Sequence, residues 1–466
     1  MKIETLIITN FKGITHIELN NLADTVVIAG PNGCGKSSIF DALKLWKSVY
    51  GGYFANEIQS WYGEHGLSIG NNSLNAILQD KSQPMTIYAE LTLSESERTW
   101  LHANAASVLR TAAYRRRVPE YALEWKNFED ASMADNLRGH RDSVRNEVEN
   151  ELPVFLKDLN ERIIPGHLTY SADGTTELLP SIVLSRIFAI YDPAHIGKFD
   201  YHGPQRSFGR ENVGGISLQL EQYENQRQTH ALYNSANKYG NVKSELASAY
   251  VRDLISKEFS TLHDVDYKSM SLVDTVKEMF DKFFPGKKFL GVRPESDGRL
   301  TFDVITAAGK HDLGDLSSGE KELIYGYLRL KNESPKNSII MFDEPELHLN
   351  PRLTEGLPDF YHKHIGQALN HQLWLITHSD SILRQSVGHE NFSVYHMQGA
   401  GLYDGEEQAV PLHGASELNR AIFDLVGDLA AYSPNSKSIS WKGAGTQSSM
   451  SISFTRFSQN FRKGLT

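Results

Sequence analysis

The 466-residue sequence contains a single cysteine, Cys34, so it cannot form an internal disulfide or a metal site built from several cysteines. No run of 18 apolar residues occurs, and no opening segment combines a basic head, an apolar stretch and a small-residue cleavage site. We therefore expect a cytoplasmic chain without a membrane partner. The net charge of −10 argues against a wholly basic nucleic-acid binder but leaves a local basic patch open.

Two pairs of strands are predicted from local patterns. Residues 1–10 and 15–22 alternate enough to be paired strands, and residues 289–292 and 300–305, split by a Ser-Asp-Gly turn, are predicted to form a hairpin.

A glycine-rich segment follows a buried apolar run. Residues 25–29 (TVVIA) lead into GPNGCGKS, which matches G-x-x-x-x-G-K-S, and a helical pattern follows. In such a loop the glycines let backbone N–H groups converge on a phosphate. Lys36 then supplies a cation for the β/γ oxygens, and Ser37 offers a hydroxyl to Mg²⁺. The sequence therefore predicts a nucleotide and magnesium site, in which we interpret Cys34 as a small filler of the loop.

A second apolar run ends in two acids. Residues 338–342 (SIIMF) run into Asp343 and Glu344, as expected of a buried parallel strand with carboxylates at its C-terminal edge. Ligands bind at that edge of α/β sheets. Asp343 would hold Mg²⁺ directly or through water, and Glu344 would polarise a water for attack on a phosphate. An isolated Asp-Glu-Pro can also simply end a strand in a turn.

Two further segments are predicted to lie near these acids. Residues 316–320 (LSSGE) precede an amphipathic run, so Ser317 and Gly319 are expected at a helix N-terminus, where backbone N–H groups bind phosphate. Residues 372–376 (QLWLI) resemble another buried strand and end just before His378. His378 would then occupy the same sheet edge, either as a γ-phosphate contact or as a structural histidine.

The region between these motifs is predicted to be a long insert, in which helical and charge-rich patterns cover residues 94–117, 130–162 and 216–259. Arg110 and the arginine run at 115–117 could contact nucleic-acid phosphates, but we favour a solvated helix face. Gln205 could reach Mg²⁺ and Arg206 a phosphate, while a plain turn is at least as consistent. The predicted domains are an N-terminal lobe (1–93), a mainly helical insert or arm (94–289), a C-terminal lobe (290–434) and a basic Ser-rich tail (435–466).

Four segments in this order, GPNGCGKSS, LSSGE, IIMFDEP and LITHS, resemble the ATP-binding-cassette ATPases of the SMC and RecF type. The segment DEPELHLNP, with FKGI near the N-terminus, is similar to bacterial OLD-family and related antiphage ATPases, including those of the Septu and PARIS types. The resemblance covers about residues 1–50 and 290–385. It implies an α/β fold, namely an ATPase head whose mixed sheet has a parallel core and an antiparallel β-subdomain, with a long helical insert.

The resemblance also implies an ATPase with ATP and Mg²⁺ as cofactors, in which two heads sandwich two ATP molecules. Ser37 and Asp343 would hold the metal, and Glu344 the attacking water. His378 would sense the γ-phosphate, while Ser317 and Gly319 would complete the site of the opposite protomer. The loop residues expected at the nucleotide are Gly30, Asn32, Gly33, Gly35, Lys36, Ser37 and Ser38.

OLD-family members continue into a Toprim nuclease module, which needs Glu and Asp residues that hold Mg²⁺. Residues 435–466 contain no Asp or Glu, and we interpret them as a disordered or weakly ordered basic end. Nuclease activity would then come from a partner. Our first hypothesis is an ATPase that senses or regulates an effector nuclease or toxin in antiphage defence. The alternatives are a RecF-like repair ATPase acting on DNA, and a scaffold that uses ATP only as glue.

Overall fold

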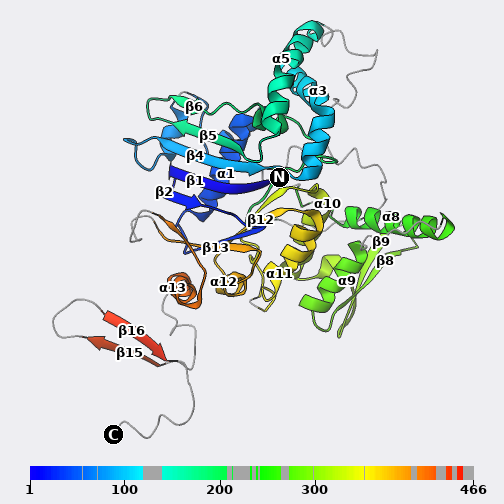
Figure 1. Cartoon of the computed structure of the whole chain (residues 1–466). Helices are drawn as coiled ribbons and strands as arrows, with labels where there is room; N and C mark the ends of the chain where they lie inside the picture. Colours follow the sequence, from blue (N-terminus) through cyan, green and yellow to red (C-terminus); the bar gives the residue numbers. More distant parts are fainter. Residues whose placement is uncertain are drawn as a thin grey trace.

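The computed structural model describes residues 1–54, 56–70, 72–118, 139–206, 213, 231–232, 238–239, 242–263, 272–296, 299–350, 352–399, 407–426, 437–442 and 449–454. At its centre is a six-stranded sheet in the order β14-β13-β3-β12-β11-β7 (Figure 1). Five neighbouring strands are parallel, and β14 pairs antiparallel with β13 at one edge. The strands are β3 (Thr25–Ala29), β7 (Phe199–His202), β11 (Ile339–Asp343), β12 (Gln372–Thr377), β13 (Phe392–Met397) and β14 (Ala409–Pro411).

The central strands are buried on both faces, which explains their continuous apolar sequences. Alternate residues enter two different cores, because successive side chains of a strand point to opposite faces. Val26 and Ile28 of β3 pack in the core that contains helix α1 (Lys36–Tyr50). Val27 and Ala29 pack in the core that contains helix α10 (Ser318–Glu333). The predicted buried strands before Gly30, at 338–342 and at 372–376 are therefore confirmed.

A five-stranded antiparallel sheet, in the order β2-β1-β4-β5-β6, shares the first core with α1. In Figure 1 it lies above the central sheet. The predicted pairing of the first two strands is confirmed, with Ile8 opposite Ile17. The elements of this part are β1 (Lys2–Phe11), β2 (Ile14–Leu19), α2 (Glu57–Glu64), the 3₁₀ turn η1 (Ser73–Ile77), β4 (Met85–Thr92), β5 (Ile164–Tyr170) and β6 (Thr176–Leu178).

Part of the expected insert returns to the head. Helices α3 (Glu95–Arg117) and α5 (Arg141–Leu159) pack against each other and project at the top of Figure 1, and the short α6 (Ile182–Ile187) follows. Strands β5 and β6 extend the antiparallel sheet, however, and β7 pairs with β11 in the central sheet. The arginine run ends α3, where Arg116 and Arg117 bind Glu147 of α5. These two arginines therefore join the helices of the insert.

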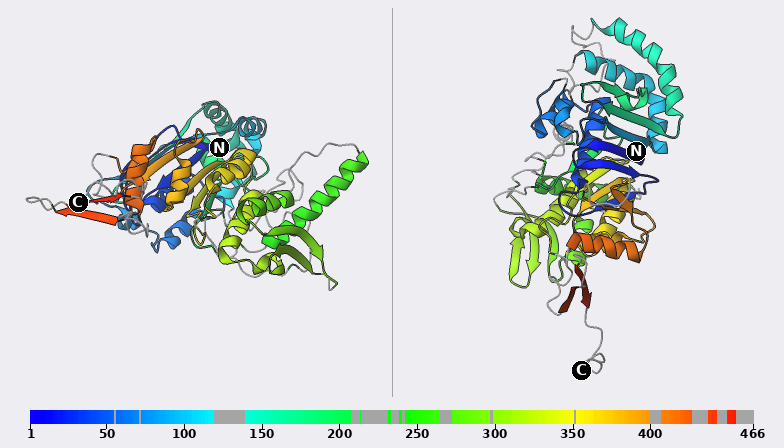
Figure 2. Two further views of the ribbon diagram at one scale, coloured as in Figure 1. Left: turned by 90° about the horizontal axis from the view of Figure 1, so that it is seen from below. Right: turned by 90° about the vertical axis from the view of Figure 1, so that its left-hand side faces the viewer.

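A three-stranded antiparallel sheet, β10-β9-β8, lies with two helices at one side of the molecule (Figure 2). The predicted hairpin is confirmed, with Phe289 opposite Val304, and β10 is an additional strand. Helix α9 packs on β8, whereas α8 extends away from the sheets. The bounds are α8 (Val242–His263), α9 (Leu272–Phe283), β8 (Lys288–Pro294), β9 (Leu300–Thr306), β10 (Gly309–Asp312) and the 3₁₀ turn η3 (Leu313–Asp315).

The remaining described elements are α11 (Leu357–Tyr361), the π-helical turn η4 (His362–Gln367), α12 (Asp380–Ser386), α13 (Ala415–Val426), β15 (Lys437–Lys442) and β16 (Ser449–Phe454). The tail, expected to be disordered or weakly ordered, contains the antiparallel pair β15 and β16, with Ile439 opposite Ile452. Of the helical patterns predicted at 130–162 and 216–259, residues 130–138, 216–230, 233–237 and 240–241 lie outside the described residues. The described residues 231–232 and 238–239 are bends and turns, and the helix of this range begins at Val242. Within the described ranges, no helix is long and apolar enough to cross a membrane.

Candidate functional site

The phosphate loop predicted at Gly30 to Ser37 joins β3 to α1. Gly33 and Gly35 adopt φ angles of 78° and 96°, in the left-handed region that favours glycine. A Cβ atom on Gly30 would lie 2.2 Å from the carbonyl oxygen of Met397 at the end of β13. The loop is also held from outside, because the Gln408 side chain donates to the Cys34 carbonyl over 2.9 Å. Close packing and backbone conformation both select the glycines.

The ammonium group of Lys36 is hydrogen-bonded to the main chain of this loop. It donates to the carbonyl oxygens of Gly30 and Pro31 over 2.9 and 2.8 Å, and its side chain is buried. Burial lowers the pKa of Lys36, while the Cys34 thiol and the acids beyond it oppose that shift. Burial also raises the pKa of Cys34, which keeps the thiol protonated. Cys34 therefore fills the loop, and Lys36 is the cation placed at the expected phosphate position.

Asp343, the last residue of β11, has chemistry suited to a divalent cation. Its side chain is 1% exposed, and Oδ1 has no hydrogen-bond partner among the described residues. Burial raises its pKa to about 7, with Glu344 and Asp41 adding to the rise, while a hydrogen bond from the exposed Ser37 opposes it. A buried carboxylate beside a hydroxyl is a ligand pair that Mg²⁺ accepts, with phosphate and water completing the shell. The residues present therefore fit Mg²⁺.

Glu344 and His378 meet at the same edge of the sheet. The main chain of Glu344 has φ 52°, and its N–H donates to the Ile376 carbonyl of β12 over 2.9 Å. Its Oε1 atom lies 3.0 Å from His378 Nε2, and His378 Nδ1 lies 3.3 Å from Lys36 Nζ. A neutral imidazole with its proton on Nε2 satisfies both contacts. Lys36, His378 and Glu344 thus form one continuous line of polar contacts.

Ser317 and Gly319 lie at the start of α10, as predicted. The Ser317 side chain accepts from the Glu320 N–H, and Glu320 accepts from the Ser317 N–H over 3.0 Å, which is a capping box. A Cβ atom on Gly319 would lie 2.4 Å from the His348 carbonyl, so the helix start rests on the turn after β11. Ser317 and Ser318 are exposed. Among the described residues, no hydrogen bond or ion pair joins Ser317 or Gly319 to the phosphate loop of the same chain.

The outer surface of the loop carries the remaining predicted nucleotide contacts. Asn32 and Gly33 are exposed there, and the Ser38 N–H donates to the Gly35 carbonyl over 3.0 Å as α1 begins. Within the described ranges, no group of three or more His, Cys, Asp and Glu residues could hold a metal by itself. A cation at this site would therefore depend on phosphate oxygens for part of its coordination.

The roles of two residues of the site were not identified from the sequence. Glu346 Oε1 accepts from the Thr377 hydroxyl over 2.6 Å, the His378 N–H over 2.7 Å and the Ser379 N–H over 3.1 Å. It thereby fixes the turn that carries His378. Its position two residues after Glu344 was the only available signal.

Arg206, the second of these residues, is buried, and it donates to the main chain of Asp343 and Glu344. The option that Arg206 binds a phosphate is therefore wrong, because its guanidinium is used inside the protein.

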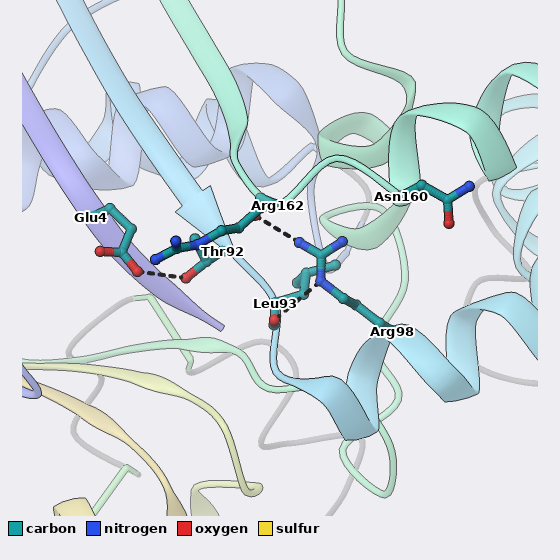
Figure 3. Close-up of a pocket in the computed structure, with 6 residues that line it drawn as sticks. All are labelled: Glu4, Thr92, Leu93, Arg98, Asn160 and Arg162. Atoms are coloured by element: carbon teal, nitrogen blue, oxygen red, sulfur yellow. Dashed lines mark hydrogen bonds between the residues drawn. The ribbon is translucent and has the colours of Figure 1, made fainter.

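A separate pocket of about 360 Å³ contains none of the motif residues (Figure 3). It is lined by Glu4, Thr92, Leu93, Arg98, Asn160 and Arg162. Arg98 donates to the carbonyls of Leu93 and Arg162, over 3.3 and 2.7 Å, and thus joins the start of α3 to the segment before β5. The pocket is a junction between elements and lies outside the candidate site.

Comparison with known proteins identifies a family that this chain matches. A family model described as the RecF/RecN/SMC N terminal domain matches residues 2–401. An uncharacterized protein of Methanocaldococcus jannaschii is 32% identical over 122 residues, which are 23% of this chain and 54% of that protein. The chain therefore spans about half the length of this relative.

Among solved structures, the SMC head domain from Thermotoga maritima has a TM-score of 0.39 at 13% identity, covering 89% of this chain and 100% of that one. The Smc head with an extended coiled coil from Pyrococcus furiosus, bound to the C-terminal domain of ScpA, has a TM-score of 0.42 at 13% identity. That match covers 91% of this chain and 99% of the other. Both likenesses are too low to add to the family match.

Proposed function

The chain belongs to the RecF/RecN/SMC N-terminal domain family, and from this premise we propose that it binds and hydrolyses ATP at the edge of its central sheet. The observation that carries the proposal is the line of contacts from Lys36 through His378 to Glu344. It places a cation, an imidazole and a carboxylate around the end of a phosphate loop. These are the groups needed to hold a γ-phosphate and to accept a proton from an attacking water.

Each residue has a separate task in the proposed reaction. Lys36 exchanges the carbonyls of its own loop for phosphate oxygens, which are stronger acceptors because they are charged. Ser37 and Asp343 would hold Mg²⁺, which neutralises phosphate charge when bound. Glu344 accepts the proton of the attacking water, and His378 holds the carboxylate in place by hydrogen bonding.

We propose that two heads form each complete site. The start of α10 presents the exposed Ser317 at a positive helix end, which suits a phosphate. The nucleotide site of the same chain already has Lys36, Ser37 and Asp343. The start of α10 is therefore better suited to complete the nucleotide site of a second protomer. A head-to-head dimer would place Ser317 and Gly319 of each protomer against the ATP of the other.

We further propose that ATP turnover regulates a partner effector, a nuclease or toxin, in cytoplasmic antiphage defence. The segment DEPELHLNP supports a role in antiphage defence, and the absence of Asp and Glu from residues 435–466 supports a separate effector. The second candidate is a RecF-like or SMC-like ATPase that acts on DNA, which the family match over residues 2–401 favours. Stimulation of phosphate release by DNA would support the second candidate. A nuclease recovered with the native complex from its host would support the first.

The catalytic proposal is tested by Glu344→Gln. We expect ATP binding to remain while phosphate release falls about 100-fold or more, because the amide cannot accept the proton. Calorimetry and a phosphate-release assay measure the two effects. Glu355→Gln, which changes an exposed glutamate after the same strand, is the control and should hydrolyse ATP like the parent. Parental turnover by Glu344→Gln would refute the role of Glu344, and a parent protein that releases no phosphate would favour the scaffold alternative.

A further inference from the structure

Glu344 is held in an unusual backbone conformation. Its φ of 52° lies in the left-handed region, which costs a residue with a Cβ atom of the order of 1 kcal/mol or more. Such a conformation persists only where surrounding contacts impose it. The bond from its N–H to the Ile376 carbonyl is one such contact. The other side of the peptide is held by a residue from a distant part of the chain.

Arg206, which follows β7, supplies that second contact. Its guanidinium donates to the Asp343 carbonyl over 2.8 Å and to the Glu344 carbonyl over 2.7 Å. It also donates to the Gly203 carbonyl over 2.7 Å, and its Nε binds Glu322 of α10. The Arg206 side chain is fully buried, and its guanidinium carbon lies 4.8 Å from the centre of the Phe342 ring.

This arrangement uses the fork geometry of arginine. A planar guanidinium can donate to two successive carbonyls and to a carboxylate at the same time, whereas an ammonium carries a single point charge on a flexible stem. The two carbonyls belong to Asp343 and Glu344, the two acids of the proposed site. Locking this backbone therefore sets the direction of the Glu344 carboxylate toward His378.

We propose that Arg206 is a positioning residue for ATP hydrolysis, which holds the main chain of Glu344 in its left-handed conformation and ties it through Glu322 to helix α10. The inference rests on the proposed function, since it concerns how the hydrolytic carboxylate is aimed. It also links two parts of the site. Helix α10 carries Ser317 at its start and Glu322 in its second turn, so a shift of this helix on dimer closure would be transmitted to Glu344.

The test replaces the buried pair as a unit, because removing Arg206 alone would leave Glu322 buried and unpaired. The variant Arg206→Met with Glu322→Leu keeps the volume and should fold. We expect unchanged ATP affinity and a fall in kcat of about 100-fold, the typical cost of misplacing a catalytic group by about 1 Å. The control is Arg186→Met with Glu151→Leu, a partly buried pair between α6 and α5, which should retain parental turnover.

A second variant distinguishes two roles of Arg206, the orientation of the Glu344 main chain and the ion pair with Glu322. Arg206→Lys keeps a cation beside Glu322 but cannot span both carbonyls, so we expect kcat to fall while ATP affinity remains. Parental kcat in Arg206→Lys, or in the double variant, would overturn the inference.

A crystal structure of the double variant gives a readout independent of turnover. We expect Glu344 to leave the left-handed region, and a retained φ near 52° would refute the inference. The φ angle of Glu344 in the variant tests the role of Arg206 even if the parent protein releases no phosphate. Absence of phosphate release by the parent would count against the proposed function and not against the role of Arg206.

Discussion

The Nε2 atom of His378 lies 3.0 Å from the Oε1 atom of Glu344, although 34 positions separate these residues in the sequence. The contact arises because β11 and β12 are parallel neighbours in register, with Asp343 opposite Ile376. Each strand therefore delivers its next residues to one edge of the sheet. The other imidazole nitrogen faces Lys36, which begins α1 after the phosphate loop that follows the adjacent strand β3. Three neighbouring strands thus assemble the polar line proposed to act on the γ-phosphate.

Removing the cation of the loop should weaken nucleotide binding. We expect Lys36→Ala to lower ATP affinity about 10- to 100-fold, because charge-assisted hydrogen bonds to the β/γ oxygens are lost. Isothermal titration calorimetry with MgATP measures the change. Lys81→Ala, at an exposed position, is the control and should bind like the parent. Tight ATP binding by Lys36→Ala would contradict the assignment of the phosphate loop.

The buried carboxylate of Asp343 should make the stability of the nucleotide-free protein depend on pH. Its folded pKa of about 7 exceeds the usual value near 3.8. Below about pH 4 the Asp343 carboxyl is protonated in both the folded and the unfolded protein, so it adds no pH dependence to the free energy of unfolding. Between about pH 4 and 7 only the folded protein carries this proton. Stability should therefore fall as pH rises through this window, by at most about 4 kcal/mol.

An asparagine cannot ionise, so the stability of Asp343→Asn should not fall between about pH 4 and 7 through this group. We expect this variant to be more stable than the parent at pH 8 when neither MgATP nor free Mg²⁺ is present. Urea unfolding at pH 5 and pH 8 measures the difference. Saturating MgATP should reverse the order at pH 8, because the parent alone keeps a charged ligand for the cation. Identical pH profiles for the two proteins would argue against a buried, proton-binding Asp343.

The composite site can be tested by mixing two inactive proteins. Ser317→Arg puts a bulky cation where the partner's γ-phosphate would dock, so we expect one head to bind ATP while dimer closure and hydrolysis fail. Mixed with Lys36→Ala, it should regain one intact site per mixed dimer and therefore part of the ATPase activity.

Ser317→Ala is the matched control, because it removes the helix cap, worth about 1 kcal/mol, without adding bulk. Equal loss of hydrolysis in Ser317→Ala would assign the effect to the cap. Mixed dimers demonstrated by mass that recover no ATPase activity would show either a site built within one chain or two sites that must act together. Hydrolysis by a strictly monomeric form would refute the two-head site.

Glu346 should act through the position of His378. We expect Glu346→Ala to lower kcat about 10- to 100-fold with little change in KM, because three donors of the Thr377 to Ser379 turn lose their acceptor. Glu346→Gln keeps the acceptor oxygen and should recover most of the activity. Steady-state phosphate release measures both variants. Parental kcat in Glu346→Ala would mean that the turn holds its conformation without this carboxylate.

The motifs of the sequence were sufficient to place Asp343, Glu344 and His378 at one sheet edge, because an apolar run followed by polar residues is a local pattern. The N-terminal strand pair and the hairpin at Phe289 to Ile305 were also predicted from local patterns, namely alternation in the first case and a Ser-Asp-Gly turn in the second. The roles of Arg206 and Glu346 depend instead on which strands lie side by side. Strand β7 is four residues long, and neither its length nor its composition indicates that it pairs with β11.

The order of strands in the central sheet constrains when the protein can fold. Strand β3 ends at residue 29, yet its two neighbours are β12 and β13, which end at residues 377 and 397. The strand that carries the phosphate loop therefore has no partner in this sheet until β12 (Gln372–Thr377) has been synthesised. Long-range parallel pairing of this kind is slow and leaves unpaired edges exposed during synthesis. A nascent chain should thus depend on chaperones until its last parallel strand arrives, and nucleotide binding would come at the end of folding.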